Sequence, residues 1–232
     1  MTVRASLLAV LVVAGWSSSA SAYCRLTTSD ADPEGRACVE EGRPLEWRRG
    51  CIGYSLEAMG SRFHTLADAR AVAGRSFGAW LAAACPEGPL PLQIVETEEL
   101  VTCTRPEYDG DDGNSNVLSF RSAWPEEYSA GAFAITTVFH SRSTGEILDA
   151  DIAINEEHFE WTICPERGCV RDESGEFTQV DFENVLTHEV GHFLGLAHSN
   201  RGGSVMDAGS PIGDTNNRVI RTDDRTGVCE TY

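Results

Sequence analysis

Lysine is absent from this 232-residue sequence, so all 18 of its basic residues are arginine. Acidic residues number 36, which gives a formal net charge of −18 at pH 7. A chain with such an excess of negative charge repels phosphate backbones, so its composition excludes nucleic acid as a partner. The absence of lysine by itself indicates no function.

After residue 22 the sequence has no apolar segment long enough to cross a membrane, which would take about 20 residues. The one long apolar run extends from Leu7 to Trp16, follows Arg4 and leads to Ala20-Ser21-Ala22. A basic residue, an apolar run and small residues in this order are typical of a secretory signal peptide. We therefore expect a secreted protein that is cleaved after Ala22. Cleavage would remove Arg4 with the signal peptide, so the mature chain would have a net charge of −19.

The cysteines include no CxxC pair, which argues against a cysteine zinc cluster. All eight lie after residue 22, at positions 24, 38, 51, 85, 103, 164, 169 and 229. An even number in an exported chain predicts up to four disulfides. The sequence suggests one pairing, Cys164–Cys169, because it would close the short loop of residues 165–168.

Repeats and sustained heptads are also missing, so nothing in the sequence predicts assembly, and we expect a monomer. Residues 23–46 combine two cysteines with prolines and glycines, and we predict an irregular N-terminal segment there, followed by one domain over residues 47–232.

Apolar patterns predict strands at 51–56, 92–95, 117–120, 133–140 and 147–154, and helices at 65–84, from 181 onward and at 223–230.

The stretch from His188 to His198 carries the clearest chemistry in the sequence. On a helix, His188 and His192 leave the same face one turn apart, so they can share one metal ion. Glu189 follows the first histidine and lies beside that ion, where it can take a proton from water. Gly195 can end the helix in the left-handed conformation and bring His198 back as a third nitrogen ligand. Three protein ligands leave a position open for water, as in catalytic zinc sites.

This HExxHxxGxxH pattern and the following Ser204-Val205-Met206-Asp207 resemble the metzincin signature with its methionine turn. Leu186-Thr187-His188-Glu189 and the stretch from Gly195 to Ser199 are similar to the matrixin branch, the relatives of matrix metalloproteinases (M10). Thr222–Val228 is similar to the last helix of that family. The resemblance covers about residues 45–232 and is strongest over 181–232.

The resemblance implies an α+β fold, namely a metzincin-like zincin domain. In that fold a twisted five-stranded mixed sheet and long helices, here tied by disulfides, support the active-site helix with its HExxH motif. One catalytic Zn²⁺ would be held by His188, His192 and His198, with Glu189 as general base. Gly195 and Met206 would support the site, Met206 from beneath the histidines. The implied activity is that of a secreted zinc endopeptidase.

The same resemblance places the predicted strand Phe133–His140 at the sheet edge beside the active-site cleft. Unpaired N–H and C=O groups at such an edge can pair with an extended peptide, so we expect a protein or peptide substrate along this strand. The alternative is a non-catalytic, exported binding module that a metal stabilises, because a fold does not by itself establish an activity.

Two features depart from the matrixin pattern. The pro-segment motif PRCGxPD, whose cysteine sits on the zinc, does not occur, so the sequence does not predict that form of latency. Residues Asp207-Ala208-Gly209-Ser210-Pro211 lack the proline-aromatic wall of the specificity pocket. The shape of that pocket therefore cannot be carried over from the family.

Calcium is a candidate second cofactor. Asp109, Asp111 and Asp112 lie in a glycine-containing turn, and their carboxylate oxygens suit Ca²⁺. Their spacing differs from that of an EF-hand, however, and the same composition is typical of a solvated turn. Asp149 and Asp151 lie two residues apart on a predicted strand, so they share a face. By resemblance they occupy positions where matrixins have acidic residues, some of them calcium ligands.

Overall fold

The computed structural model describes residues 23–29, 38–102, 105–111, 114–166, 168–199 and 202–232. The predicted signal peptide, Cys103 and Asp112 lie outside these ranges. The elements, in chain order, are β1 (Cys24–Arg25), β2 (Cys51–Leu56), α1 (Leu66–Leu81), β3 (Gln93–Glu96), β4 (Asn116–Arg121), β5 (Ala134–His140), β6 (Ile147–Asn155), β7 (Glu160–Thr162), β8 (Gln179–Asp181), α2 (Phe182–Phe193), β9 (Leu196–Ala197), the 3₁₀ turn η1 (Asn216–Arg218) and α3 (Thr222–Thr231).

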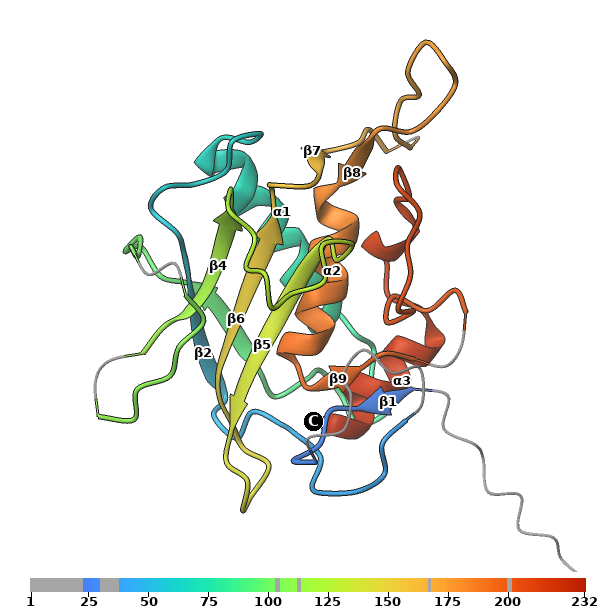
Figure 1. Ribbon diagram of the computed structural model, residues 1–232. Helices are drawn as coiled ribbons and strands as arrows, with labels where there is room; N and C mark the ends of the chain where they lie inside the picture. Colours follow the sequence, from blue (N-terminus) through green and yellow to red (C-terminus); the bar gives the residue numbers. More distant parts are fainter. Residues whose placement is uncertain (1–22, 30–37, 103–104, 112–113, 167, 200–201) are drawn as a thin grey trace, which may run out of the picture.

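A mixed five-stranded sheet with strand order β3-β2-β4-β6-β5 forms the centre of the fold (Figure 1). The pairs β2–β3, β2–β4 and β4–β6 are parallel, whereas β5 runs antiparallel to β6 and forms one edge. The mixed sheet, the helices and the disulfides agree with the predicted α+β fold. The strand predicted beside the cleft is therefore an edge strand.

The predicted elements differ from the structure mainly at their ends. Strand β3 begins one residue later than predicted, and α1 ends at Leu81 instead of residue 84. Thr65 begins α1 as predicted, because its hydroxyl accepts from the Asp68 amide at 3.1 Å in a capping box. Helix α3 has Arg221 at its N-cap, one residue before the predicted Thr222.

Helices α1 and α2 lie on one face of the sheet (Figure 1) and pack against each other through aromatic side chains. The indole N–H of Trp80 donates to the Thr187 carbonyl at 2.8 Å, and the indole N–H of Trp47 donates to the Phe193 carbonyl at the same distance. The ring of Phe77 contacts Phe193 edge-on, with centroids 5.2 Å apart. Because each buried apolar side chain contributes about 1.5–3 kcal/mol, these contacts hold α2 firmly in place.

Asp181 begins α2, as the sequence predicted. Its Oδ1 accepts from the Asn184 amide at 2.7 Å, and its Oδ2 accepts from the Cys164 amide at 2.9 Å. The guanidinium of Arg218 pairs with the same buried carboxylate. A buried charge is tolerated only when it is paired and hydrogen-bonded, and here three partners satisfy it.

The described part of the N-terminal segment, residues 23–29 and 38–46, includes a strand that its composition does not predict. Strand β1 pairs antiparallel with β9, and the Leu26 amide donates to the Gly195 carbonyl at 2.9 Å. A two-residue strand has no periodicity, so no local pattern indicates it. This pairing attaches the segment to the turn before His198, and the domain boundary at residue 46 stays a prediction.

Three disulfides join described residues: Cys24–Cys38, Cys85–Cys229 and Cys164–Cys169. The last of them confirms the pairing predicted from the sequence. Among the described residues, Cys51 is the free cysteine. No helix in the described ranges is long and apolar enough to cross a membrane.

Candidate active site

Three histidines converge at the end of α2. The Nε2 atom of His192 lies 3.1 Å from Nε2 of His188 and 3.2 Å from Nε2 of His198. Helical spacing brings the first two together. The third arrives because Gly195, with a φ of +85°, turns the chain into β9. A Cβ at Gly195 would also lie 2.5 Å from the Leu45 carbonyl oxygen. Both the positive φ and this close contact therefore favour glycine at the position.

Backbone carbonyls orient two of the imidazoles. Nδ1 of His188 donates to the Val205 carbonyl at 2.6 Å, and Nδ1 of His192 donates to the Leu196 carbonyl at 2.8 Å. With the proton on Nδ1, each Nε2 presents a lone pair. Burial lowers the pKa of His188, and burial together with the two neighbouring histidines lowers the pKa of His192 well below its ordinary value.

This donor set fits zinc. Neutral imidazoles are good zinc ligands, and Zn–N bonds of 2.0–2.1 Å in a tetrahedron place the nitrogens about 3.3 Å apart. The observed Nε2 separations of 3.1 and 3.2 Å are close to that value. Three lone pairs aimed at one point repel one another unless a cation lies between them, so the histidines are arranged for a metal ion.

Glu189 lies beside the histidines and is 5% exposed. Burial raises the pKa of Glu189 to about 7, and a hydrogen bond from Thr136 opposes that rise. The Thr136 hydroxyl lies 2.6 Å from Glu189 Oε2. A carboxyl group with a pKa near neutrality can both accept and release a proton at physiological pH.

The turn at Met206 lies directly against α2. A Cβ at Gly191 would be 2.1 Å from the Met206 sulfur, so the absence of a side chain there allows the close approach. The turn is held by Asp224 on α3, whose carboxylate accepts from the Ser204 hydroxyl at 2.6 Å and from the Val205 amide at 3.0 Å. Helix α3 therefore supports the turn whose Val205 carbonyl orients His188.

A cavity of about 600 Å³ opens over the histidines. One wall is the start of the edge strand, residues 133–136, and the other includes Ala208, Gly209 and Ser210. Asn184 ties this second wall together, because its amide donates to the Ser210 hydroxyl and its oxygen accepts from the Asn217 amide. The cleft thus lies between an unpaired sheet edge and a loop of small and polar residues.

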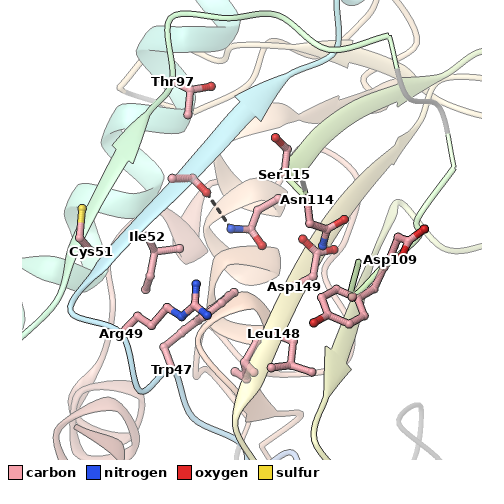
Figure 2. A pocket seen from close by; sticks show the side chains of 15 residues that line it. Trp47, Arg49, Cys51, Ile52, Thr97, Asp109, Asn114, Ser115, Leu148 and Asp149 are labelled. Atoms are coloured by element: carbon pink, nitrogen blue, oxygen red, sulfur yellow. Dashed lines mark hydrogen bonds between the residues drawn. The ribbon is translucent and has the colours of Figure 1, made fainter. Parts of the chain in front are cut away.

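The candidate calcium ligands are only partly brought together. Asp149 and Asp151 share one face of β6, both buried, and their side chains are hydrogen-bonded to each other. Asp109 and Asp149 line one cavity of about 370 Å³, on which Asn114 and Ser115 also border (Figure 2). Asp111 is exposed and does not line that cavity, and Asp112 is outside the described residues.

The carboxyl groups of Asp149 and Asp151 are both buried, which disfavours their charged forms. Burial raises the pKa of both Asp149 and Asp151, although backbone amides of Val117 and Glu107 donate to Asp151 and oppose its shift. Oδ2 of Asp149 is buried and has no hydrogen-bond partner among the described residues. An unsatisfied buried carboxylate oxygen in a cavity is a favourable position for a cation.

Comparison with known protein families identifies a family over the part of the chain that holds the site. The matrixin family model matches residues 118–232, a range that includes the edge strand, all three histidines and the turn at Met206. The chain belongs to the matrixin family. No curated protein sequence matches this matrixin at a significant level.

Two contacts of this matrixin site escaped sequence reasoning. Thr136 and Glu189 are 53 residues apart, and Asp224 lies 19 residues after Val205. Neither pair has a local spacing signal, because a strand, a turn and a separate helix bring them together. The sequence shows that residues 207–211 lack the proline-aromatic wall. It does not show that Asn184 holds the loop at Ser210 that lies there instead.

Proposed function

We propose that this matrixin is a zinc endopeptidase that hydrolyses peptide bonds in extended polypeptides. The observation that carries the proposal is the convergence of three histidine nitrogens beside a buried glutamate, at the floor of a cleft bordered by a sheet edge. Membership of the matrixin family supports a metalloendopeptidase.

His188, His192 and His198 would hold the zinc ion. When bound, zinc supplies a Lewis acid that polarises the scissile carbonyl and lowers the pKa of water. Glu189 accepts a proton from the attacking water and then delivers it to the leaving amine, so it acts first as general base and then as general acid. Its raised pKa of about 7 favours both steps at neutral pH.

The substrate would lie in an extended form along β5. The edge strand offers main-chain N–H and C=O groups to the cleft, and an added peptide strand can satisfy them. Pairing through the main chain demands little of the substrate sequence. The side-chain preference therefore depends on the opposite wall of Ala208, Gly209 and Ser210.

Export is the second part of the proposal. The sequence of residues 1–22 is typical of a signal peptide, and three disulfides among the described residues suit an oxidising compartment. We therefore propose a secreted enzyme that begins at Tyr23 after cleavage.

Calcium binding at Asp149 and Asp151 is a separate proposal. It is supported by the buried, unpartnered Oδ2 of Asp149 and by the oxygen-rich side chains around the same cavity. A Ca²⁺ ion would neutralise the two carboxylates, which otherwise must share a proton. Asp109 could contribute from across the cavity.

Cleavage of denatured casein by the purified mature protein tests the enzymatic proposal. The control is Glu189→Gln, which keeps the shape of the side chain but cannot accept a proton. We expect the wild type to cut casein and the variant to lose at least ~10²-fold in rate, the range of general acid–base catalysis, with one zinc still bound. If Glu189→Gln cut as fast as the wild type, the role of Glu189 would be wrong.

Zinc content separates the roles of the histidines from that of Glu189. His198→Ala should lose both zinc and activity, whereas Glu189→Gln should lose activity alone. If the wild type held zinc and cut neither casein nor a peptide library, the activity proposal would fail. The non-catalytic binding module would then be the better reading.

A further inference from the structure

The hydroxyl of Thr136 is placed to hydrogen-bond Glu189 at two points. Thr136 lies on the edge strand β5 and lines the cleft. Its Oγ1 is 2.6 Å from Oε2 of Glu189 and 3.2 Å from the backbone carbonyl oxygen of the same residue. Among the described residues, Thr136 is the side chain that bonds the Glu189 carboxyl group.

A threonine hydroxyl has one proton to donate, and here that proton can fix the Oε2 end of the carboxyl group. When Glu189 is ionised, Thr136 donates to Oε2. Because Thr136 occupies Oε2, the other carboxyl oxygen, Oε1, is the one that takes the proton from water and releases it to the amine. Thr136 can therefore keep donating to Oε2 in both protonation states of the carboxyl group, with the same heavy-atom positions.

We propose that Thr136 is a positioning residue that holds Glu189 in one side-chain conformation throughout its proton cycle. The inference rests on the proposed function, in which Glu189 takes a proton from water and gives it to the amine. Thr136 gains and loses no proton in that cycle, because it keeps donating to Oε2 while Oε1 carries the transferred proton. The carboxyl group therefore need not move between its two roles, which favours rapid transfer.

A purely structural reading of Thr136 makes a different prediction. Threonine and valine are both favoured in strands and have nearly the same shape, so a packing role would be served by either residue. The proposal instead requires the hydroxyl. Thr136→Val removes it, Thr136→Ser keeps it, and Thr136→Ala is a second hydroxyl-free variant in case valine disturbs the fold.

Steady-state cleavage of a peptide substrate provides the first test. We expect Thr136→Val and Thr136→Ala to lower kcat by about tenfold or more, part of the general acid–base contribution, with KM little changed. Thr136→Ser should restore most of kcat. Thr137→Val is the matched control, because Thr137 is the next residue on β5 and points to the other face of the sheet, and it should keep wild-type kcat.

The zinc-free protein provides a test that needs no activity. The carboxyl carbon of Glu189, labelled with ¹³C and identified by its loss in Glu189→Gln, reports hydrogen bonding to that group by NMR. Its resonance should shift in Thr136→Val and Thr136→Ala but stay in place in Thr136→Ser and Thr137→Val.

An unmoved resonance in both hydroxyl-free variants, or wild-type kcat in either, would overturn the inference. Equal losses of kcat in the serine and valine variants would also overturn it, because the hydroxyl would then be irrelevant. An inactive wild type would contradict the proposed function instead, and the NMR comparison would still decide whether Thr136 holds Glu189.

Discussion

Gly191 lies between the two histidines of α2, with its Cα facing Met206 and Trp80. A Cβ there would be 2.1 Å from the Met206 sulfur and 2.8 Å from Cζ2 of Trp80. Both neighbours are buried, at 2% and 0% exposure, so neither can move aside easily. The position thus requires glycine despite its low helix propensity.

Gly191→Ala should therefore destabilise the protein by about 1–3 kcal/mol, the range for overpacked cores, and weaken zinc binding by displacing Met206 or α2. Gly74→Ala is the control, because Gly74 lies at an exposed position of α1 with nothing within 4 Å of its added Cβ. That variant should gain about 0.5–1 kcal/mol from the better helix propensity of alanine. Urea unfolding and zinc titration of both variants measure these effects. Equal stability of the two would show that the close contact carries no strain.

At the level of single elements, β6 combines a core face with a charged face. Ile152 and Ile154 are buried in the core, whereas Asp149 and Asp151 are buried on the opposite face. Burial raises the pKa of both carboxyl groups above the ordinary value of 3.8. A carboxyl group that binds its proton more tightly in the folded state favours folding at low pH. That contribution is lost as the pH rises above the ordinary carboxyl range toward the folded-state pKa.

Without divalent cations, the wild type should therefore lose stability relative to Asp149→Asn as the pH rises from 5 to 8. The asparagine resembles the protonated carboxyl group at every pH. Asp109→Asn, the same change at an exposed position, should show no such difference. Urea unfolding in chelator at several pH values measures the comparison. The prediction would be wrong if the unfolding free energy of the wild type rose relative to that of Asp149→Asn as the pH increased.

Added Ca²⁺ extends the same experiment to the proposed cation site. It should stabilise the wild type at pH 8 and have little effect on Asp149→Asn, because binding to the folded state alone raises stability by mass action. Equal stabilisation of both variants would place calcium elsewhere on the molecule.

The strands of the five-stranded sheet and the three α-helices could be predicted from the sequence, because each has a local signal. The apolar stripe and the Thr65 cap predicted α1, and the helical spacing of His188 and His192 predicted how α2 presents them. Strand β1 could not be predicted, since it exists only through its pairing with Leu196 and Ala197. The contact between Thr136 and Glu189 likewise depends on how β5 and α2 pack.

For the whole molecule, two of the disulfides differ greatly in the length of chain that they close. Cys85–Cys229 joins the segment after α1 to α3 across a sequence separation of 144, whereas Cys164–Cys169 spans 5. In the chain-entropy description, closing these loops restricts the unfolded state by about 5 and about 2 kcal/mol, respectively. The longer bridge should thus contribute far more to stability.

Replacing both cysteines of each bridge by serine tests this difference. The Cys85→Ser/Cys229→Ser protein should lose about 3 kcal/mol more stability than Cys164→Ser/Cys169→Ser, as measured by urea unfolding. It should also bind zinc more weakly at 37 °C, because α3 supports the turn at Met206 through Asp224. Equal losses from the two bridges would mean that native contacts, and not loop length, decide their contribution.

The hold of Asp224 on Ser204, Val205 and Met206 has a consequence for the timing of activity during synthesis. Asp224 follows the three histidines in the chain, so it emerges from the ribosome after them. The proposed protease therefore becomes competent only when α3 has emerged and docked. A chain truncated before Asp224 would carry every proposed metal ligand and still lack the residue that fastens the turn beneath them.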